Sequence, residues 1–123
     1  MSKILIIEDE QDLARALRRQ LVDRKFEVIC AYDAYQGLKL AQDNVPDLII
    51  LDLMLPAGGG LGTLKNIKMS AKTGHVPVIV LTGMKNDELK KKVKEEGVEA
   101  YLEKPYDINE LVGVISGILQ GKG

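Results

Sequence analysis

Residues that could carry out chemistry follow several short apolar runs in this sequence: Glu8, Asp9, Asp52, Thr82 and Lys104. Asp52 is the most unusual of them, because it lies within LIILDLMLP, a run that is otherwise typical of a strand buried on both faces. An isolated ionised carboxylate in a dry interior is so costly that it protonates, finds a partner or binds a metal. The run around Asp52 therefore raises the question of what stabilises its charge.

Each of these residues also has an ordinary structural interpretation when it is taken singly. Asp9 could cap a helix, Thr82 could end a strand, and Lys104 could be a solvated lysine. Taken together, they place three carboxylates, a hydroxyl and an ammonium group at the ends of different predicted strands. We interpret this combination as one site.

A cluster of Glu8, Asp9 and Asp52 needs a partner that neutralises it. Two like charges ~4 Å apart repel by about 4 kcal/mol at an effective dielectric constant of ~20. A small divalent cation removes this repulsion, and oxygen ligands with room for water suit Mg²⁺, or Mn²⁺ as a substitute, rather than zinc. His75 stands alone in a predicted loop, so we assign it no ligand role.

The alternation of apolar runs with helical segments predicts how these residues are positioned. Short runs rich in Ile, Val and Leu are expected to form strands over Lys3–Ile7, Glu27–Ala31, Asp47–Leu51, Val78–Leu81 and Ala100–Glu103. The longer segments between them repeat apolar residues at helical spacing. This pattern predicts an α/β fold with a doubly wound parallel sheet and helices on both faces. Sites in such sheets lie at the carboxyl ends of the strands, where the candidate residues fall.

The predicted helices each present one apolar face. In the first four helices, the residues expected on that face are Leu13, Leu17, Leu21, Leu38, Ala41, Leu61, Leu64, Leu89 and Val93. In the fifth, Asp107 is expected to cap the N-terminus, with Glu110 three residues later. The helix over residues 87–96 has only two apolar anchors among several lysines, so we expect it to be mobile. Those lysines are either a solvated face or a partner surface.

Length and composition indicate one globular domain over residues 1–123, because 46% of the residues are hydrophobic and 28% are charged. A formal net charge of −1 gives no electrostatic case for binding nucleic acid or an anionic membrane. A single cysteine, Cys30, rules out an internal disulfide, fits a reducing compartment and is expected in the core. The N-terminal apolar run is too short for a signal peptide or a membrane span, so we expect a cytoplasmic location.

Four motifs spread along the chain resemble the receiver domain of two-component response regulators, the CheY-like family. They are IIEDE with its acidic pair, PDLIILDLMLP with the central aspartate, VIVLTG with the threonine, and YLEKP with the lysine and proline. None of them is specific alone, but the combination in this order is. The resemblance implies a single flavodoxin-like (βα)5 domain with a parallel five-stranded sheet in the order 2-1-3-4-5.

The resemblance also implies roles for the acidic residues. Asp52 would accept a phosphoryl group from a phosphohistidine on a sensor histidine kinase or a phosphotransfer protein. Mg²⁺ would be bound directly by Asp9, by Asp52 and by the backbone carbonyl of Met54, and through water by Glu8. The metal would neutralise charge on the transferring oxygens.

The same resemblance implies a conformational switch. Lys104 would offer its positive charge to the phosphoryl group, and the Thr82 hydroxyl would bind one of its oxygens. Phosphorylation would draw Thr82 inward and let Tyr101 turn into the space left behind. The Lys104–Pro105 peptide bond would be cis. The face made by the fourth helix, the fifth strand and the fifth helix would then bind a downstream protein target.

We further expect a monomer or a weak phosphorylation-dependent dimer, with no nucleic-acid or membrane partner and no output domain in this chain. It would not be an enzyme, apart from catalysing its own aspartyl phosphorylation and dephosphorylation. One departure from the family pattern is AGGGLG, which lacks a bulky residue and an acid or asparagine before Gly60. The loop through Gly58 and Gly59 should therefore be looser, and no nucleotide-binding motif fits this glycine run.

Two other functions remain open at this point. A haloacid-dehalogenase-like phosphohydrolase also combines an aspartyl nucleophile, a threonine or serine, a lysine and Mg²⁺. That family needs a second aspartate two residues after the nucleophile, and this chain has Met54 there. A degenerate receiver could act as an interaction module without phosphorylation, but the intact acidic pair, Asp52, Thr82 and Lys104 argue against it.

Overall fold

The strands form one parallel sheet in the order β2-β1-β3-β4-β5. The computed structural model describes residues 1–55, 59–83 and 85–121 of the chain. The strands are β1 (Lys3–Ile7), β2 (Glu27–Ala31), β3 (Leu48–Asp52), β4 (Val78–Thr82) and β5 (Ala100–Glu103). The predicted fold class and strand order are confirmed. Strands β3 and β4 reach one residue further toward the carboxyl edge than predicted, so Asp52 and Thr82 belong to the strands themselves, while Asp47 lies before β3.

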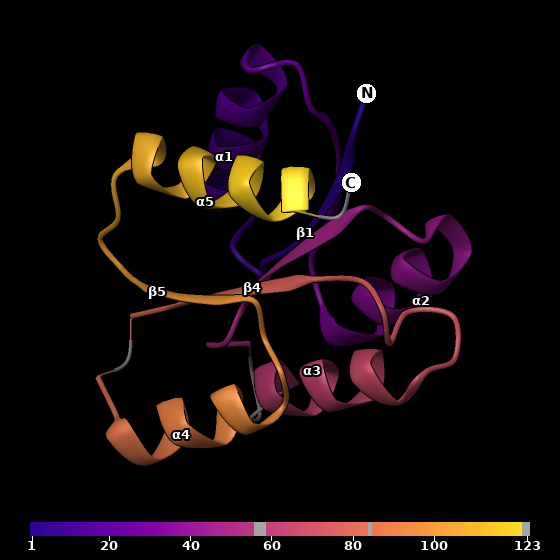
Figure 1. Cartoon of the computed structure of the whole chain (residues 1–123), viewed down its shortest axis with the longest axis vertical. Coiled ribbons are helices and arrows are strands. Elements are labelled where there is room, and N and C mark those ends of the chain that lie inside the picture. The colour runs from indigo at the N-terminus through magenta and orange to yellow at the C-terminus, as the bar shows by residue number, and fades with distance from the viewer. Residues whose placement is uncertain (56–58, 84, 122–123) are drawn as a thin grey trace.

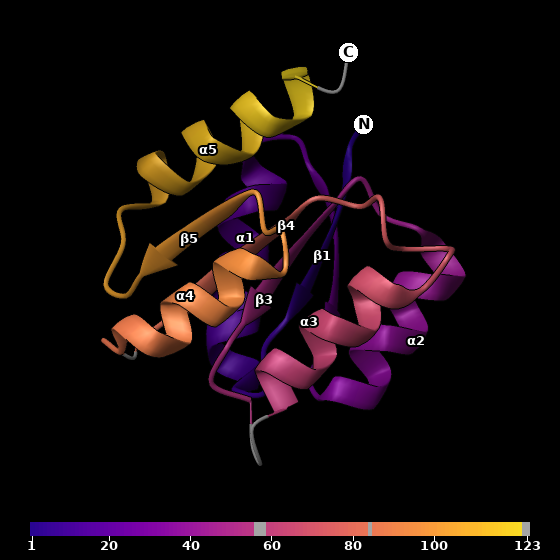
Figure 2. The same ribbon diagram turned by 60° about the horizontal axis from the view of Figure 1, so that its bottom comes forward.

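Two layers of helices cover the sheet. They are α1 (Gln11–Asp23), α2 (Ala34–Asn44), α3 (Gly59–Met69), α4 (Asp87–Glu95) and α5 (Ile108–Gly121). Helices α1 and α5 lie on one face of the sheet, and α2, α3 and α4 lie on the other (Figure 1 and Figure 2). Among the described residues, no helix combines the length and the apolar character needed to cross a membrane.

The central strands divide the core into two parts. Every residue of β3 and β4 is buried, as expected for parallel strands with helices on both faces. Along β1, Ile4 and Ile6 pack toward α1 and α5, whereas Leu5 and Ile7 pack toward α2 and α3. Cys30 packs partly buried against the first of these two cores. Continuous apolar runs in the sequence therefore correspond to strands that are covered on both sides.

Helix α1 differs from its prediction at Leu13. The residues that α1 buries are Ala14, Leu17 and Leu21, which follow one another at intervals of three and four residues. Leu13 is offset from that line by one residue, which is about 100° around a helix, and 48% of its surface is exposed. The expectation that Leu13 belongs to the core face was therefore wrong.

Helices α4 and α5 follow their sequence patterns. Val93 is the buried residue of α4, and Leu89 is partly buried against the core. The Asp107 carboxylate caps α5, because its Oδ1 accepts a hydrogen bond of 2.6 Å from the backbone N–H of Asn109. Helix α4 is thus held by few apolar contacts, and α5 begins directly after the site.

Strand β2 is the outermost strand at one edge of the sheet. Arg18 of α1 reaches over this strand, and its Nε donates a hydrogen bond of 3.3 Å to the carbonyl of Val28. A charged side chain therefore lies on the backbone of an edge strand.

Candidate functional site

The candidate residues meet at the carboxyl edge of the sheet. Glu8 and Asp9 follow β1, Asp52 ends β3, Thr82 ends β4 and Lys104 follows β5. Parallel pairing of β1 with β3, of β3 with β4 and of β4 with β5 aligns these ends. The structure thus brings together residues that are separated by up to 96 positions in the chain.

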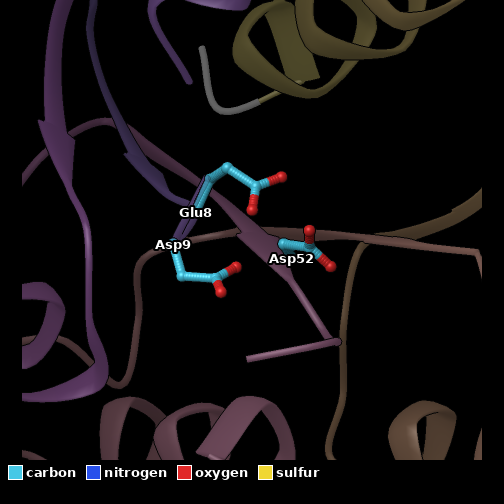
Figure 3. Close-up of side chains that lie close together, drawn as sticks. All are labelled: Glu8, Asp9 and Asp52. Atoms are coloured by element: carbon cyan, nitrogen blue, oxygen red, sulfur yellow. The ribbon is translucent and has the colours of Figure 1, made fainter. Parts of the chain in front are cut away.

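Three carboxylates form the acidic part of the site (Figure 3). Carboxylate oxygens of Glu8, Asp9 and Asp52 lie within 4.8 Å of one another. Glu8 and Asp52 are only 7% and 6% exposed, whereas Asp9 is partly exposed. The cluster is therefore open to solvent at Asp9 and enclosed at the other two carboxylates.

Lys104 supplies the positive charge that Asp52 needs. Its Nζ lies 2.9 Å from Oδ2 of Asp52 and 3.3 Å from Oε1 of Glu8. The other oxygen of Asp52, Oδ1, accepts a hydrogen bond of 2.8 Å from the backbone N–H of Met54. The Lys104–Pro105 peptide bond is cis. These contacts answer the question raised by the sequence, because both oxygens of the buried carboxylate have donors.

The two buried carboxyl groups differ in their acidity. Burial, reinforced by a hydrogen bond with Asp52, raises the pKa of Glu8 to about 7. Burial also opposes the charge on Asp52, but hydrogen bonds from Glu8, the Met54 amide and Lys104 outweigh it, so the pKa of Asp52 lies below its usual range. Lys104 is likewise opposed by burial, yet its contacts with Asp52 and Glu8 raise its pKa. Near neutral pH, Asp52 is ionised and Glu8 is poised between its two forms.

Thr82 and Tyr101 lie on the neighbouring strands β4 and β5, where Tyr101 pairs with Val80. Thr82 is fully buried. Tyr101 of β5 is half-buried against the core beneath α4, and the Lys90 Nζ lies 5.3 Å from the centre of its ring. This geometry is a cation–π contact, which joins α4 to β5.

One feature of the site had no separate signal in the sequence, namely the hydrogen bond from the Met54 amide, which depends on the turn after β3. Gly60 matches a glycine of the family pattern, and the structure shows its physical reason. A side chain there would overlap the carbonyl oxygen of Leu53, so α3 begins directly against the segment that follows Asp52. Gly58 lies outside the described residues, and the expected looseness of this loop stays a prediction.

The acidic residues fit a hard divalent cation. All three side chains of the cluster offer carboxylate oxygens, which are the ligands that Mg²⁺ and Mn²⁺ prefer. The raised pKa of Glu8 also fits a cation site. A buried acid beside a second carboxylate has a high pKa, and a nearby cation would lower that pKa by favouring the ionised form. The donor set therefore suits the metal that the sequence predicts.

Known proteins share this fold and sequence pattern. A sequence model of the family described as "Response regulator receiver domain" matches residues 4–116. Response regulator ArlR of Staphylococcus aureus is 40% identical over 120 residues, which cover 98% of this chain and 53% of the relative. A response regulator receiver domain protein from Clostridium thermocellum has a TM-score of 0.91 at 30% identity, covering 99% of this chain and 97% of the other. Chemotaxis protein CheY4 of Vibrio cholerae has a TM-score of 0.88 at 27% identity, covering 96% and 98%.

The chain therefore belongs to the response regulator receiver domain family, as the four motifs indicated. Members of this family are signal-transducing domains of two-component systems. The chain spans about half the length of the curated relatives it matches. The expectations of no nucleic-acid partner and no output domain stay predictions.

Proposed function

We propose that this chain is the phosphoacceptor of a two-component phosphorelay, with Asp52 accepting a phosphoryl group from a phosphohistidine. The donor is a sensor histidine kinase or a phosphotransfer protein. The observation that carries this proposal is the contact of 2.9 Å between Lys104 and an ionised Asp52 at the edge of an acidic cluster. A lone buried ion pair would not need two further carboxylates beside it.

Mg²⁺ would be held by Asp9, Asp52 and the backbone carbonyl of Met54, with Glu8 acting through water. When bound, it supplies positive charge to the oxygens of the transferring phosphoryl group. Asp9 is suited to meet the cation first, since it is more exposed than the other two carboxylates of the cluster. Mn²⁺ would serve as a substitute.

Asp52, Lys104 and Thr82 each have a separate role in the proposed transfer. A carboxylate oxygen of Asp52 forms a bond to phosphorus as the phosphorus–nitrogen bond of phosphohistidine breaks, and the imidazole nitrogen keeps the electron pair and takes a proton from solvent. The Lys104 ammonium stabilises charge on the transferred group from its place beside Asp52. The Thr82 hydroxyl binds a phosphoryl oxygen after transfer.

The output of this reaction would be a change at the face made by α4, β5 and α5. Movement of Thr82 toward the phosphoryl group would let Tyr101 turn inward, which would end its contact with Lys90 on α4. Helix α4 is thinly anchored, so it can move at low cost. A downstream protein that prefers the changed face would in turn stabilise the phosphorylated state.

Labelling with acetyl phosphate and Mg²⁺ tests the proposal. We expect one hydroxylamine-labile phosphate per chain on the unchanged protein, detected as a mass increase. Asp52→Asn should abolish it, and Asp43→Asn, at an exposed position of α2 that pairs with Lys39, is the matched control. Continuous turnover of acetyl phosphate without accumulation would favour a phosphohydrolase. No labelling and no turnover would favour an interaction module that works without phosphorylation.

A further inference from the structure

A cavity of about 280 Å³ opens beside the site, between α1 and the segment that leads into α5. Its floor is formed by the sheet residues Ile6, Ile50 and Leu81, and Ala14 and Leu17 of α1 form one wall. All five side chains are hydrocarbon. Gln20, an exposed residue of α1, also lines the cavity and can hydrogen-bond a ligand, but the five hydrocarbon side chains favour an apolar group.

The polar end of the same cavity is the phosphorylation site itself. Asp52, Lys104 and Glu8 line it there, and Pro105 and Tyr106 close the side opposite α1. Tyr106 is partly buried, and desolvation raises the pKa of its hydroxyl. The acceptor carboxylate and the apolar space are thus two ends of one cavity.

Two residues at the solvent-facing rim belong to the exposed side of α1. Leu13, which is 48% exposed, and Ala16 both line the cavity. The small side chain of Ala16 leaves the entrance open. The offset of Leu13 from the buried line of α1 therefore gives the rim of this cavity an apolar edge.

We propose that this cavity receives the planar ring of a phosphodonor's leaving group, so that the protein prefers ring-bearing donors over compact ones. The inference rests on the proposed function, in which phosphohistidine, whose leaving group is an imidazole ring, is the donor. Size supports it, because a cavity of roughly 150 Å³ is enough to hold benzene. The position of Asp52 supports it as well, because Asp52 and the apolar residues line the same cavity. A donor could therefore place its phosphoryl group at Asp52 and its attached ring in the apolar part.

Benzoyl phosphate and acetyl phosphate form a matched pair of donors for testing this preference. In both reactions an oxygen of Asp52 forms a bond to phosphorus, the phosphorus–oxygen bond to the acyl group breaks, and a carboxylate leaves with the electron pair. Only the ring distinguishes the two donors. We expect the second-order labelling rate of the unchanged protein to be about ten-fold or more higher with benzoyl phosphate, because its ring is removed from water in the cavity.

Ala16→Leu tests whether the cavity causes the preference. Leucine is a good helix former, and at this rim position it fills the entrance from an exposed site of α1. We expect the ratio of the two labelling rates to fall toward one. Arg19→Leu places the same side chain on the exposed surface of α1 outside this cavity and should keep the ratio of the unchanged protein.

A binding measurement without phosphoryl transfer provides a second readout. Phenylphosphonate carries the ring but cannot transfer its phosphorus, and methylphosphonate lacks the ring. We expect phenylphosphonate alone to shift the methyl resonances of Leu17, Ile50 and Leu81. Equal labelling rates with the two acyl phosphates, or methyl resonances unmoved by phenylphosphonate, would overturn the inference while the proposed function stands. Failure of both donors to label Asp52 would refute the proposed function and the inference with it.

Discussion

Glu8 is the carboxyl group of the site whose pKa burial raises to about 7. Its carboxyl is enclosed, shares a hydrogen bond with Asp52 and accepts one from Lys104. Burial and the neighbouring Asp52 together raise its pKa well above the ordinary range of a glutamate. A cation must therefore displace a proton from Glu8 at and below neutral pH.

We expect the Mg²⁺ affinity to depend on pH in consequence. A group whose pKa is raised to about 7 is mostly ionised at pH 8 and mostly protonated at pH 6, so the affinity should fall as the pH is lowered. The limiting slope is about ten-fold per pH unit for one displaced proton. Calorimetric titrations with Mg²⁺ between pH 6 and pH 8 measure it. Glu8→Gln should bind more weakly but lose the dependence, and an affinity that is constant over this range would contradict the expectation.

The residues of the site could be predicted from the sequence because their types are unusual where they stand. Asp52 interrupts a buried run, and Glu8 with Asp9 ends another. Their partners within the site were harder to predict, since the Met54 amide and the cavity wall at Ala16 depend on side-chain and turn geometry in three dimensions. The sequence alone does not show that Ala16 lines a cavity, because alanine is common at exposed helix positions.

At the scale of the elements, helix α5 contains two exposed glycines in its interior. Gly113 and Gly117 lie on its exposed side, and a side chain added at either position would have nothing within 4 Å. Glycine inside a helix costs about 1 kcal/mol relative to alanine, because the unfolded chain loses more freedom. Helix α5 is therefore less stable than its length allows.

Gly113→Ala and Gly117→Ala should each raise the free energy of unfolding by about 0.5–1 kcal/mol. Urea denaturation followed by circular dichroism measures the change. Gly60→Ala is the contrasting variant and should lower the stability, because its new methyl group would overlap the carbonyl oxygen of Leu53. A loss of stability at both α5 positions would mean that these glycines have contacts that the structure does not reveal.

Element boundaries were predicted to within one residue for the strands, and the errors have a common cause. The strands were predicted from runs of apolar residues, so each prediction stopped at the first polar residue. Asp52 and Thr82 were therefore placed just beyond the strands that contain them. Leu13 was assigned to the core because its spacing to Leu17 is helical. Spacing alone does not fix which of two adjacent lines faces the sheet, and the small Ala14 occupies the buried one.

At the scale of the whole molecule, the proposed switch would couple the site at the carboxyl edge of the sheet to the face made by α4, β5 and α5. Within that face, the ammonium group of Lys90 on α4 lies over the ring of Tyr101 on β5. A cation–π contact at a partly exposed position is worth about 0.5–1 kcal/mol, which a phosphoryl-driven movement of Thr82 could readily overcome. The predicted docking face is thus held in its resting form by weak contacts.

Beryllofluoride, which mimics a phosphoryl group on Asp52, should therefore change amide chemical shifts far from the metal site. We expect changes at residues 85–106 as well as around Asp52, measured by two-dimensional NMR in the presence of Mg²⁺. Thr82→Val removes the hydroxyl at similar volume and should keep the changes around Asp52 while reducing those in α4 and β5. Chemical-shift changes confined to the metal site in the unchanged protein would contradict the proposed switch. Sedimentation of the same samples would distinguish a monomer from a weak dimer.

The side chain of Arg18 should reduce aggregation of this protein at high concentration. An outer strand of a sheet offers backbone groups on which a foreign strand can grow, and such growth leads to fibrils. Arg18 already donates to the Val28 carbonyl on β2, so an incoming strand would have to displace a charged group from the backbone. The same charge on a second copy repels it from the matching edge. Arg18 thereby disfavours the addition of a foreign strand at β2, the edge of the sheet opposite β5 and the proposed docking face.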